Sequence, residues 1–484
     1  MTRRLDGSRT GTEHGIAMIT VLLVVFITSG LTAIMFYNSL HGATATGRNR
    51  CWGAAVHIAE SGVNDAIAKL QNTAGIAPTG SVTGDTAEGT YEFRVTALAR
   101  NRYQIDSVGT CGPGGSVSAS RRLRVTMAPP RSFRYALFSL SDVTTKNNNV
   151  VCGDIWANTF VVVYKNDEVL SADDPGCAGK DTAGSGSINA ATGSVTLQNN
   201  SIVSGDVWTG GYDSSGNAVS NSGTIGGNVT SSSSTPGCAD DPEHAKYDVD
   251  GGSIGGNVKA WGNLTGGASV AGTVTPFVCA TAPTPRPIPT YTFNEANYPP
   301  GTVQTFASPG AFNTYLAANG NSLSGTFYVE GGSSTNAIDL TGVKIAGDTT
   351  IVAAAAPIDG GNGVGAVLGN TDDKILVLVS YYAGAASSCT TNGGNPGDCA
   401  ISFKNNFQQS DNTAVLLYAP NGPVGFKNNA EFHGAIYANN IQVKNNMTVV
   451  YDPTVEQTVG FGEVTLDITQ WLECTPGAVT TTGC

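Results

Sequence analysis

The chain has 484 residues, 25 basic and 37 acidic side chains and a net charge of −12, and only 13% of its residues are charged. A chain so poor in Lys and Arg repels phosphate backbones, which disfavours nucleic-acid binding, and 40% hydrophobic residues are enough to exclude wholesale disorder. The 62 glycines, together with many Asn, Ser and Thr residues, favour short strands joined by tight turns over a helical enzyme.

An uncharged apolar run fills residues 16–37, close to the N-terminus. As a helix it is roughly 33 Å long, enough to cross a hydrocarbon core of about 30 Å. Arg3, Arg4 and Arg9 precede it, and the positive-inside rule then places the N-terminus in the cytoplasm and the rest of the chain outside. A secretory signal cleaved after Ala45 and an uncleaved signal anchor are both consistent with this run.

The helical pattern continues beyond the apolar run. Between Ala55 and Leu70, small and apolar residues recur every three or four positions, as on one face of an α-helix. The pattern ends before Pro78. We therefore expect one long helix over residues 16–72.

The junction between the polar leader and the apolar run, His14-Gly15 followed by Ile16, resembles that of type IV prepilins. The stretch AESGVNDA at residues 59–66 resembles the helix of PilX-type pilus assembly proteins. The resemblance implies that a prepilin peptidase cleaves after Gly15 and that the helix starting at Ile16 joins the core of a filament. Major pilins have Glu at the fifth mature position, where this chain has Thr20, and this departure favours a rare or tip subunit over the main repeat.

The resemblance also implies which side chains contact the membrane and the filament. An ordinary membrane anchor followed by a coiled stalk is the alternative for the same segment. The contacting side chains would be those of Ile16, Val21, Leu22, Leu23, Val24, Val25, Phe26, Ile27, Leu31, Ile34 and Phe36.

A small sheet is predicted after the helix. Apolar and polar residues alternate at residues 91–97, 103–106 and 122–127, with the period of two that is typical of half-buried strands. The apolar faces of three such strands can cover one side of the helix, as in a pilin head. Ala128-Pro129-Pro130 then acts as a linker.

The ten cysteines form an even set without a CxxC pair, and no His lies at zinc-like spacing from them. This favours disulfides in an oxidising compartment over a zinc site. The sequence leaves the connectivity open, and pairing of neighbours along the chain is the simplest arrangement. The candidate pairs are Cys51 with Cys111, Cys152 with Cys177, Cys238 with Cys279, Cys389 with Cys399, and Cys474 with Cys484.

Weak repeats fill the chain after residue 135. A step of Gly, a polar residue and an apolar residue recurs, as in GDI at 153–155 and GNV at 227–229, and Lys-Asn-Asn starts at 146, 404, 427 and 444. Such repeats predict a β-solenoid, in which Asn side chains can form ladders along the stack, and a β-sandwich is the alternative. A Pro-rich segment at 281–290 and a short helix at 309–319 interrupt the strands, so we expect one solenoid with a long excursion.

The sequence contains no recognisable catalytic or phosphate-binding motif. The five histidines lie outside nucleophile motifs, and we expect His433 to pack at a corner of a coil. Asp248 and Asp250 lack the full spacing of a calcium loop. We therefore expect no enzyme activity, no cofactor and no metal. Three acidic doublets in Gly- or Pro-flanked turns are expected to be solvated, namely Asp173-Asp174, Asp240-Asp241 and Asp372-Asp373.

The expected fold is mainly β, with a long N-terminal α-helix packed on a small antiparallel sheet and followed by a large β-solenoid head. The expected segments are a prepilin-type leader (1–15), a transmembrane and amphipathic helix (16–72), a pilin-like sheet (73–130), a first solenoid part (131–280), a Pro-rich excursion (281–321), a second solenoid part (322–460) and a disulfide-bearing tail (461–484).

The resemblance implies a structural and assembly role as a minor pilin of a type IV pilus-like filament, with surface adhesion by the head as an extension of that role. The expected partners are other pilin subunits, the inner assembly machinery, prepilin peptidase, the membrane, and a cell-surface or glycan ligand, but not nucleic acid. The expected location is the cytoplasmic membrane, crossed once with the head outside, and then the pilus at the cell surface. The alternative is a membrane-anchored or secreted β-helix protein that binds or acts on polysaccharide.

Overall fold

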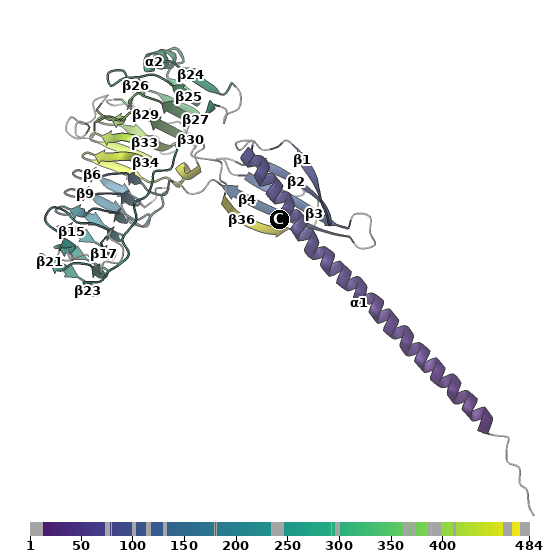
Figure 1. The fold of residues 1–484 in the computed structure, drawn as a ribbon. Helices are drawn as coiled ribbons and strands as arrows, with labels where there is room; N and C mark the ends of the chain where they lie inside the picture. Colours follow the sequence, from purple (N-terminus) through teal and green to yellow (C-terminus); the bar gives the residue numbers. More distant parts are fainter. Residues whose placement is uncertain are drawn as a thin grey trace, which may run out of the picture. The chain divides into compact units, whose positions relative to one another are not determined.

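The computed structural model describes residues 13–72, 78, 80–98, 103–112, 118–128, 133–178, 180, 182–233, 246–291, 293–295, 301–361, 367–368, 374–385, 389, 398–409, 413–457 and 467–474. Strands dominate these residues, so the fold is mainly β. The chain forms two compact units (Figure 1). The first contains the chain up to Leu98, then Arg102–Met127 and the residues from Ile468 onward, and the second contains Ala99–Asn101 and Ala128–Asp467.

The first unit consists of the helix α1 (Glu13–Asn72) and a five-stranded sheet of order β1-β2-β3-β4-β36. The first four strands pair antiparallel with their neighbours in the chain. The three alternating segments of the sequence lie in β2, β3 and β4. The bounds are β1 (Ser81–Thr86), β2 (Gly89–Ala97), β3 (Tyr103–Cys111), β4 (Ala119–Ala128) and β36 (Asp467–Cys474).

The strand β36 lies within the expected disulfide-bearing tail over 461–484. It lies beside β4, where Glu473 Oε1 is 3.1 Å from Arg121 Nη1 and the Thr469 hydroxyl donates to Thr126 O at 3.1 Å. Its apolar residues do not alternate strictly with polar ones, so the period of two was not visible in the sequence. The second unit is therefore inserted, in sequence, between two strands of the first.

The C-terminal part of α1 packs on the sheet with its backbone very close to β3. A Cβ added to Gly109 would lie 2.3 Å from Ala55 O and 2.3 Å from Ala59 N, so only glycine fits there. The Ser107 hydroxyl donates to Ala59 O at 2.8 Å. The buried residues of this helix face recur at the predicted spacing and are Ala55, Ile58, Ala59, Val63, Ala66 and Leu70.

The first half of the second unit is a stack of coils with three short strands each. Every strand pairs in parallel with the strand three places later, so the stack has three parallel columns. The first column contains β5 (Leu137–Ser139), β8 (Ile155–Ala157), β11 (Ile188–Ala190), β14 (Val207–Thr209), β17 (Val229–Ser231), β20 (Val258–Ala260) and β23 (Val274–Pro276).

The other two columns follow the same pattern. The second contains β6 (Val143–Thr145), β9 (Val161–Val163), β12 (Val195–Leu197), β15 (Asn217–Asn221), β18 (Asp248–Asp250) and β21 (Leu264–Thr265). The third contains β7 (Val150–Cys152), β10 (Glu168–Leu170), β13 (Ile202–Val203), β16 (Thr224–Ile225), β19 (Ser253–Ile254) and β22 (Ser269–Val270).

The Gly–polar–apolar step of the sequence is the corner before the first column. The polar side chain of one coil accepts a hydrogen bond from the backbone of the next: Asn228 Oδ1 from Asn257 N at 2.9 Å, and Asn257 Oδ1 from Thr273 N at 2.9 Å. Asp154 Oδ1 accepts from Ser187 N in the same way. The repeated step therefore marks the places where corner backbone groups are satisfied between coils.

The second half of the unit contains several longer strands and, after its first strand, a helix, α2 (Pro309–Ala318), at the position predicted from the sequence. The Ser308 side chain caps it, and Phe312 and Leu316 are buried. The strands are β24 (Val303–Phe306), β25 (Ser322–Val329), β26 (Ile338–Asp339), β27 (Lys344–Ala353), β28 (Ile358–Asp359), β29 (Val367–Leu368), β30 (Lys374–Ser380), β31 (Ile401–Phe403), β32 (Gln408–Gln409), β33 (Thr413–Phe426), β34 (Ala430–Val443) and β35 (Met447–Val450), followed by a 3₁₀ helix at Pro453–Gln457.

The two halves join in an order that the chain sequence does not follow. The last coil of the second half stacks on the first coil of the first half: Ile436 pairs with Leu137. The strands β34 and β35 likewise pair in parallel with β6 and β7. One hydrophobic cluster continues through both halves. The end of the second half therefore lies against the start of the first half, and Figure 1 shows the yellow-green strands beside the blue ones.

The chain reaches the far end of the stack through a return segment, residues 277–295, which includes the Pro-rich stretch. It passes successive coils in reverse order: Trp208 Nε1 donates to Thr281 O at 3.0 Å, and the Arg286 guanidinium lies 4.2 Å from the Trp156 ring centroid. Further along, the Tyr418 hydroxyl donates to Pro289 O at 2.7 Å. The expected excursion over 281–321 therefore contains residues 281–295 of this segment together with β24 and α2. The large parallel sheet fits a solenoid-like head.

Candidate functional site

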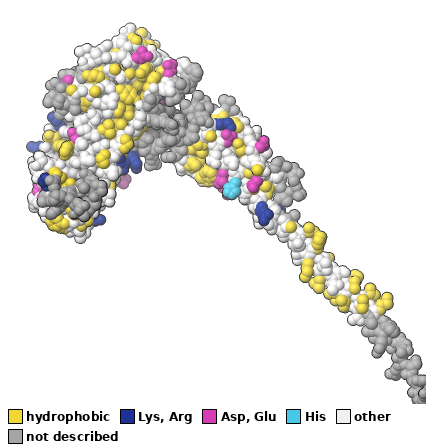
Figure 2. Space-filling model, viewed as in Figure 1, with side chains coloured by type: hydrophobic (Ala, Val, Ile, Leu, Met, Phe, Trp, Pro, Cys, Tyr) yellow, Lys and Arg dark blue, Asp and Glu magenta, His cyan; other side chains and the backbone are white. Residues whose placement is uncertain are grey.

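The N-terminal part of α1 has an exposed apolar surface, here called the apolar helix surface, over residues 18–40. Hydrophobic side chains follow this part of the helix beyond the sheet in Figure 2. Of the side chains expected to contact membrane and filament, all those whose exposure is described are more than half exposed: Val21, Leu22, Leu23, Val24, Val25, Phe26, Ile27, Leu31, Ile34 and Phe36.

Two threonine hydroxyls of this segment are hydrogen-bonded within the helix itself. The Thr28 hydroxyl donates to Val24 O at 2.8 Å, and the Thr32 hydroxyl donates to Thr28 O at 2.7 Å. A hydroxyl bonded to its own helix enters an apolar environment at little cost. These two hydroxyls can therefore be surrounded by lipid or by apolar helices while keeping their hydrogen bonds.

The apolar helix surface has the length and composition of a membrane-crossing helix. The best 18-residue window of α1 has a mean hydropathy of 2.4, and none of that window is buried. A single membrane span and a signal sequence both satisfy this description.

The predicted processing residues lie at the beginning of α1. Gly15 and Ile16 are inside the helix, which starts at Glu13, and Thr20 is exposed four residues further on. Most of the expected leader, residues 1–12, lies outside the described residues. The helix runs through this junction and on to Asn72 without a break.

Three of the expected disulfides are present in the structure, namely Cys51–Cys111, Cys152–Cys177 and Cys389–Cys399. The first joins α1 to the end of β3. Cys279 and Cys474 are also disulfide-bonded, while their expected partners, Cys238 and Cys484, lie outside the described residues. Disulfides suggest an extracytoplasmic position for both units.

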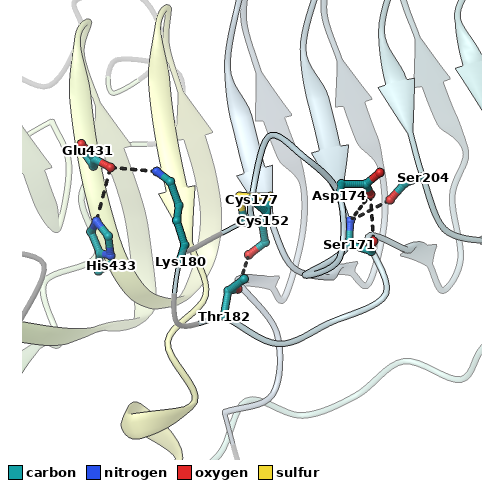
Figure 3. The surroundings of a disulfide bond; sticks show 9 residues. All are labelled: Cys152, Ser171, Asp174, Cys177, Lys180, Thr182, Ser204, Glu431 and His433. Carbon is teal, nitrogen blue, oxygen red and sulfur yellow. Dashed lines mark hydrogen bonds and ion pairs between the residues drawn. A yellow bond between two sulfur atoms is a disulfide. The ribbon is translucent and has the colours of Figure 1, made fainter.

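The Cys152–Cys177 disulfide holds a loop that contacts both halves of the stack (Figure 3). Lys180 Nζ, from this loop, is 2.9 Å from Glu431 Oε1 in β34, and His433 Nε2 is 3.4 Å from the same oxygen. The hydrogen bond from Lys180 lowers the pKa of the Glu431 carboxyl. His433 is buried beside this pair, which agrees with a packing position.

The acidic residues considered for chemistry hold turns and coils in the described part of the chain. Asp174 accepts hydrogen bonds from the Ser171 backbone and hydroxyl, and its bonds to Ser204 and Ser171 lower its pKa. Asp248 and Asp250 accept bonds from the next coil, from Asn263 N and from the Thr265 hydroxyl. The doublets at 240–241 and 372–373 lie outside the described residues. Within the described ranges, no group of three or more His, Cys, Asp or Glu residues is arranged to hold a metal ion.

A ladder of asparagines marks one corner of the stack, and its continuity across the junction was not foreseen. Adjacent side-chain amides are joined by hydrogen bonds of 3.0–3.2 Å, and all six residues have positive φ. The four Lys-Asn-Asn repeats are the signal for these corners, but their order in space cannot be derived from the repeats alone. This asparagine ladder runs Asn406, Asn429, Asn446, Asn148, Asn166 and Asn200.

No model of a known protein family, no curated protein and no solved structure matches this chain.

Proposed function

We propose that this chain is a structural and assembly subunit of a type IV pilus-like filament, a minor pilin of the PilX type. The observation that carries the proposal is the apolar helix surface, which is continuous with the helix that packs on the small sheet. The proposed head is a β-solenoid, displayed outside the cytoplasmic membrane.

The exposed side chains of α1 require a partner. Full burial of one large apolar side chain contributes about 1.5–3 kcal/mol, so covering ten of them amounts to tens of kcal/mol before the entropy of association is subtracted. Lipid provides this cover before assembly, and the helices of neighbouring subunits provide it in the filament. The hydroxyl bonds of Thr28 and Thr32 suit both environments.

The contacts of the rest of α1 suit a rigid connection between the filament core and the sheet. The Cys51–Cys111 disulfide and the close contact at Gly109 fix the helix to β3. A subunit that moves from bilayer to filament then carries its sheet with it. Because Thr20 replaces the acidic residue of major pilins, we propose a rare or tip position.

The decisive experiment determines the N-terminal residue of the mature protein, isolated from the native cell envelope, by intact mass and terminal sequencing. We expect the mature chain to begin at Ile16. Gly15→Leu should leave the leader attached, because the peptidase requires a small residue there, whereas Gly11→Leu in the same leader should be processed normally. A native chain that begins at Met1 or Thr46 would contradict the pilin proposal and favour an anchored or secreted β-helix protein that binds or acts on polysaccharide.

A further inference from the structure

Four lysines form a column along the second unit, here called the lysine column. They are the first residues of the four Lys-Asn-Asn repeats, Lys404, Lys427, Lys444 and Lys146. The strands before them are in register: Phe403 pairs with Phe426, and Phe426 pairs with Val443. The column crosses the junction between the two halves, so no stretch of sequence contains it.

Backbone bonds fix the spacing of the column. Lys427 N donates to Phe403 O at 2.8 Å, Lys444 N to Phe426 O at 3.1 Å, and Lys146 N to Val443 O at 2.8 Å. Each lysine therefore sits one coil from the next, and neighbouring parallel strands are about 4.8 Å apart. All four side chains are partly exposed, beside the exposed asparagine ladder.

Among the described residues, one charge of the column has an acidic partner and three do not. Lys404 Nζ is 2.8 Å from Asp359 Oδ2, but Lys146, Lys427 and Lys444 have no acidic partner within 4 Å among the described residues. Burial and the charges of Lys146 and Lys427 lower the pKa of Lys444. Three stacked ammonium groups thus repel one another in a chain whose net charge is −12.

The column continues into an aromatic side chain. Val143 and Val161 are paired in β6 and β9, which places Tyr164 one coil beyond Lys146. A partly exposed ring next to regularly spaced ammonium groups offers a sugar an apolar face to stack on and its acidic groups a partner.

We propose that the lysine column binds an extended anionic polysaccharide, whose carboxylates lie along the stack and pair with successive lysines. The coil spacing is close to the length of one pyranose residue, so a polyuronate can present one carboxylate to each coil. A single exposed pair contributes only about 0–1 kcal/mol, but repeated pairs on one polymer add through effective concentration. Nucleic acid is the weaker candidate, because single-strand sites need a series of aromatic platforms and the described column has one ring.

This inference rests on the proposed display of the head outside the membrane and gives content to the expected surface adhesion, but it does not depend on filament assembly. Its test uses the full chain purified in detergent, so its failure leaves the processing experiment untouched. The probe is polygalacturonate, with dextran as the neutral control and oligo-dT as the nucleic-acid control, each titrated by calorimetry at low and high salt.

The decisive variant is Lys146→Gln/Lys427→Gln/Lys444→Gln, with Lys259→Gln/Lys344→Gln/Lys374→Gln as a control of equal charge change. We expect the first variant to bind polygalacturonate at least tenfold more weakly than the wild type, and the control variant to bind within about twofold. Added salt should weaken wild-type binding, since the pairs are exposed. The first variant should also keep the wild-type circular dichroism and melting temperature.

The inference is overturned if the wild type does not bind polygalacturonate, if it binds dextran equally well, or if the two triple variants lose affinity alike. Tighter binding to oligo-dT that the column variant abolishes would also overturn it, in favour of a nucleic-acid site.

Discussion

Single residues with unusual conformations hold the corners of the large unit. The asparagines of the ladder have φ between 55° and 61°, where most side chains are strained. Asparagine tolerates this conformation and its amide also bonds to the neighbouring coil, so one residue type satisfies both requirements. The sequence showed the Lys-Asn-Asn repeats, and the structure explains why Asn, and not Gly, is used at their third position.

The corner role of Asn446 gives a test at the residue level. Asn446→Ala should lower the free energy of unfolding by about 1–3 kcal/mol, because it loses the amide bonds and keeps the positive φ. Asn446→Gly should cost about half as much, since Gly adopts this φ without strain. Urea unfolding of the full chain measures both, with Asn445→Ala as the control, because Asn445 bonds through its amide to Asn147 and Asn428 without a positive φ. Equal losses for Ala and Gly would contradict a conformational role.

Asp167 is a buried carboxyl whose titration should be visible in the stability of the protein. It accepts bonds from the Thr145 hydroxyl at 2.6 Å and from Asn149 N at 2.8 Å, and burial raises its pKa to about 6. An acid whose folded pKa lies above its unfolded value of 3.8 stabilises the fold below about pH 4, and this contribution is lost as the pH rises through about 6.

Between pH 4 and pH 7, the free energy of unfolding of the wild type should therefore fall by up to about 3 kcal/mol relative to that of Asp167→Asn. Urea unfolding at both pH values measures this shift. Asp213→Asn, in a turn of the same unit, is the control and should show a much smaller change. A pH-independent difference for Asp167→Asn would mean that the carboxyl ionises normally in the fold.

At the level of elements, the contact between α1 and β3 decides how the helix is held. The helix was predicted from its spacing of apolar residues, and the buried residues recur at that spacing. Packing of the helix on the sheet was also predicted, but the close approach of α1 to β3 was not, because it depends on Gly109, a glycine within a strand. The same holds for β36, which has no alternating pattern and is recruited from the far end of the chain.

Two glycine-to-alanine substitutions in the first unit should change the free energy of unfolding in opposite directions. Gly109→Ala should lower the free energy of unfolding by about 1–3 kcal/mol, because its Cβ collides with the helix backbone at Ala55 and Ala59. Gly53→Ala should raise it by up to about 1 kcal/mol, since that helical position is open and Ala is the better helix former. Guanidinium unfolding of the full chain in detergent measures both changes. A neutral Gly109→Ala would show that α1 stands further from β3.

At the level of the whole chain, the sequence predicted that short strands with Gly and Asn turns fill the large unit, and the interrupting helix at 309–319 was confirmed as α2. The stacking order was not predictable, because local repeats specify a coil and not its neighbour. The reversal depends on contacts of the return segment, such as the Arg286 guanidinium over Trp156, which join residues far apart in sequence. Corner residues could therefore be read from the sequence, while columns that cross the junction could not.

The reversed order of the halves has a consequence for how a growing chain reaches its native state. The coils of the first half are synthesised first and can stack at once. The edges of β5–β7 that pair with β34 and β35 stay uncovered until those strands are synthesised some 300 residues later. The Tyr451 hydroxyl then donates to Phe133 O at 2.7 Å and fastens the two ends of the unit together. A chain that terminates early keeps an open strand edge, which is the feature that proteases, chaperones and aggregating neighbours act on. Pairing with β34 and β35 therefore distinguishes the folded unit from a chain that stops before these strands.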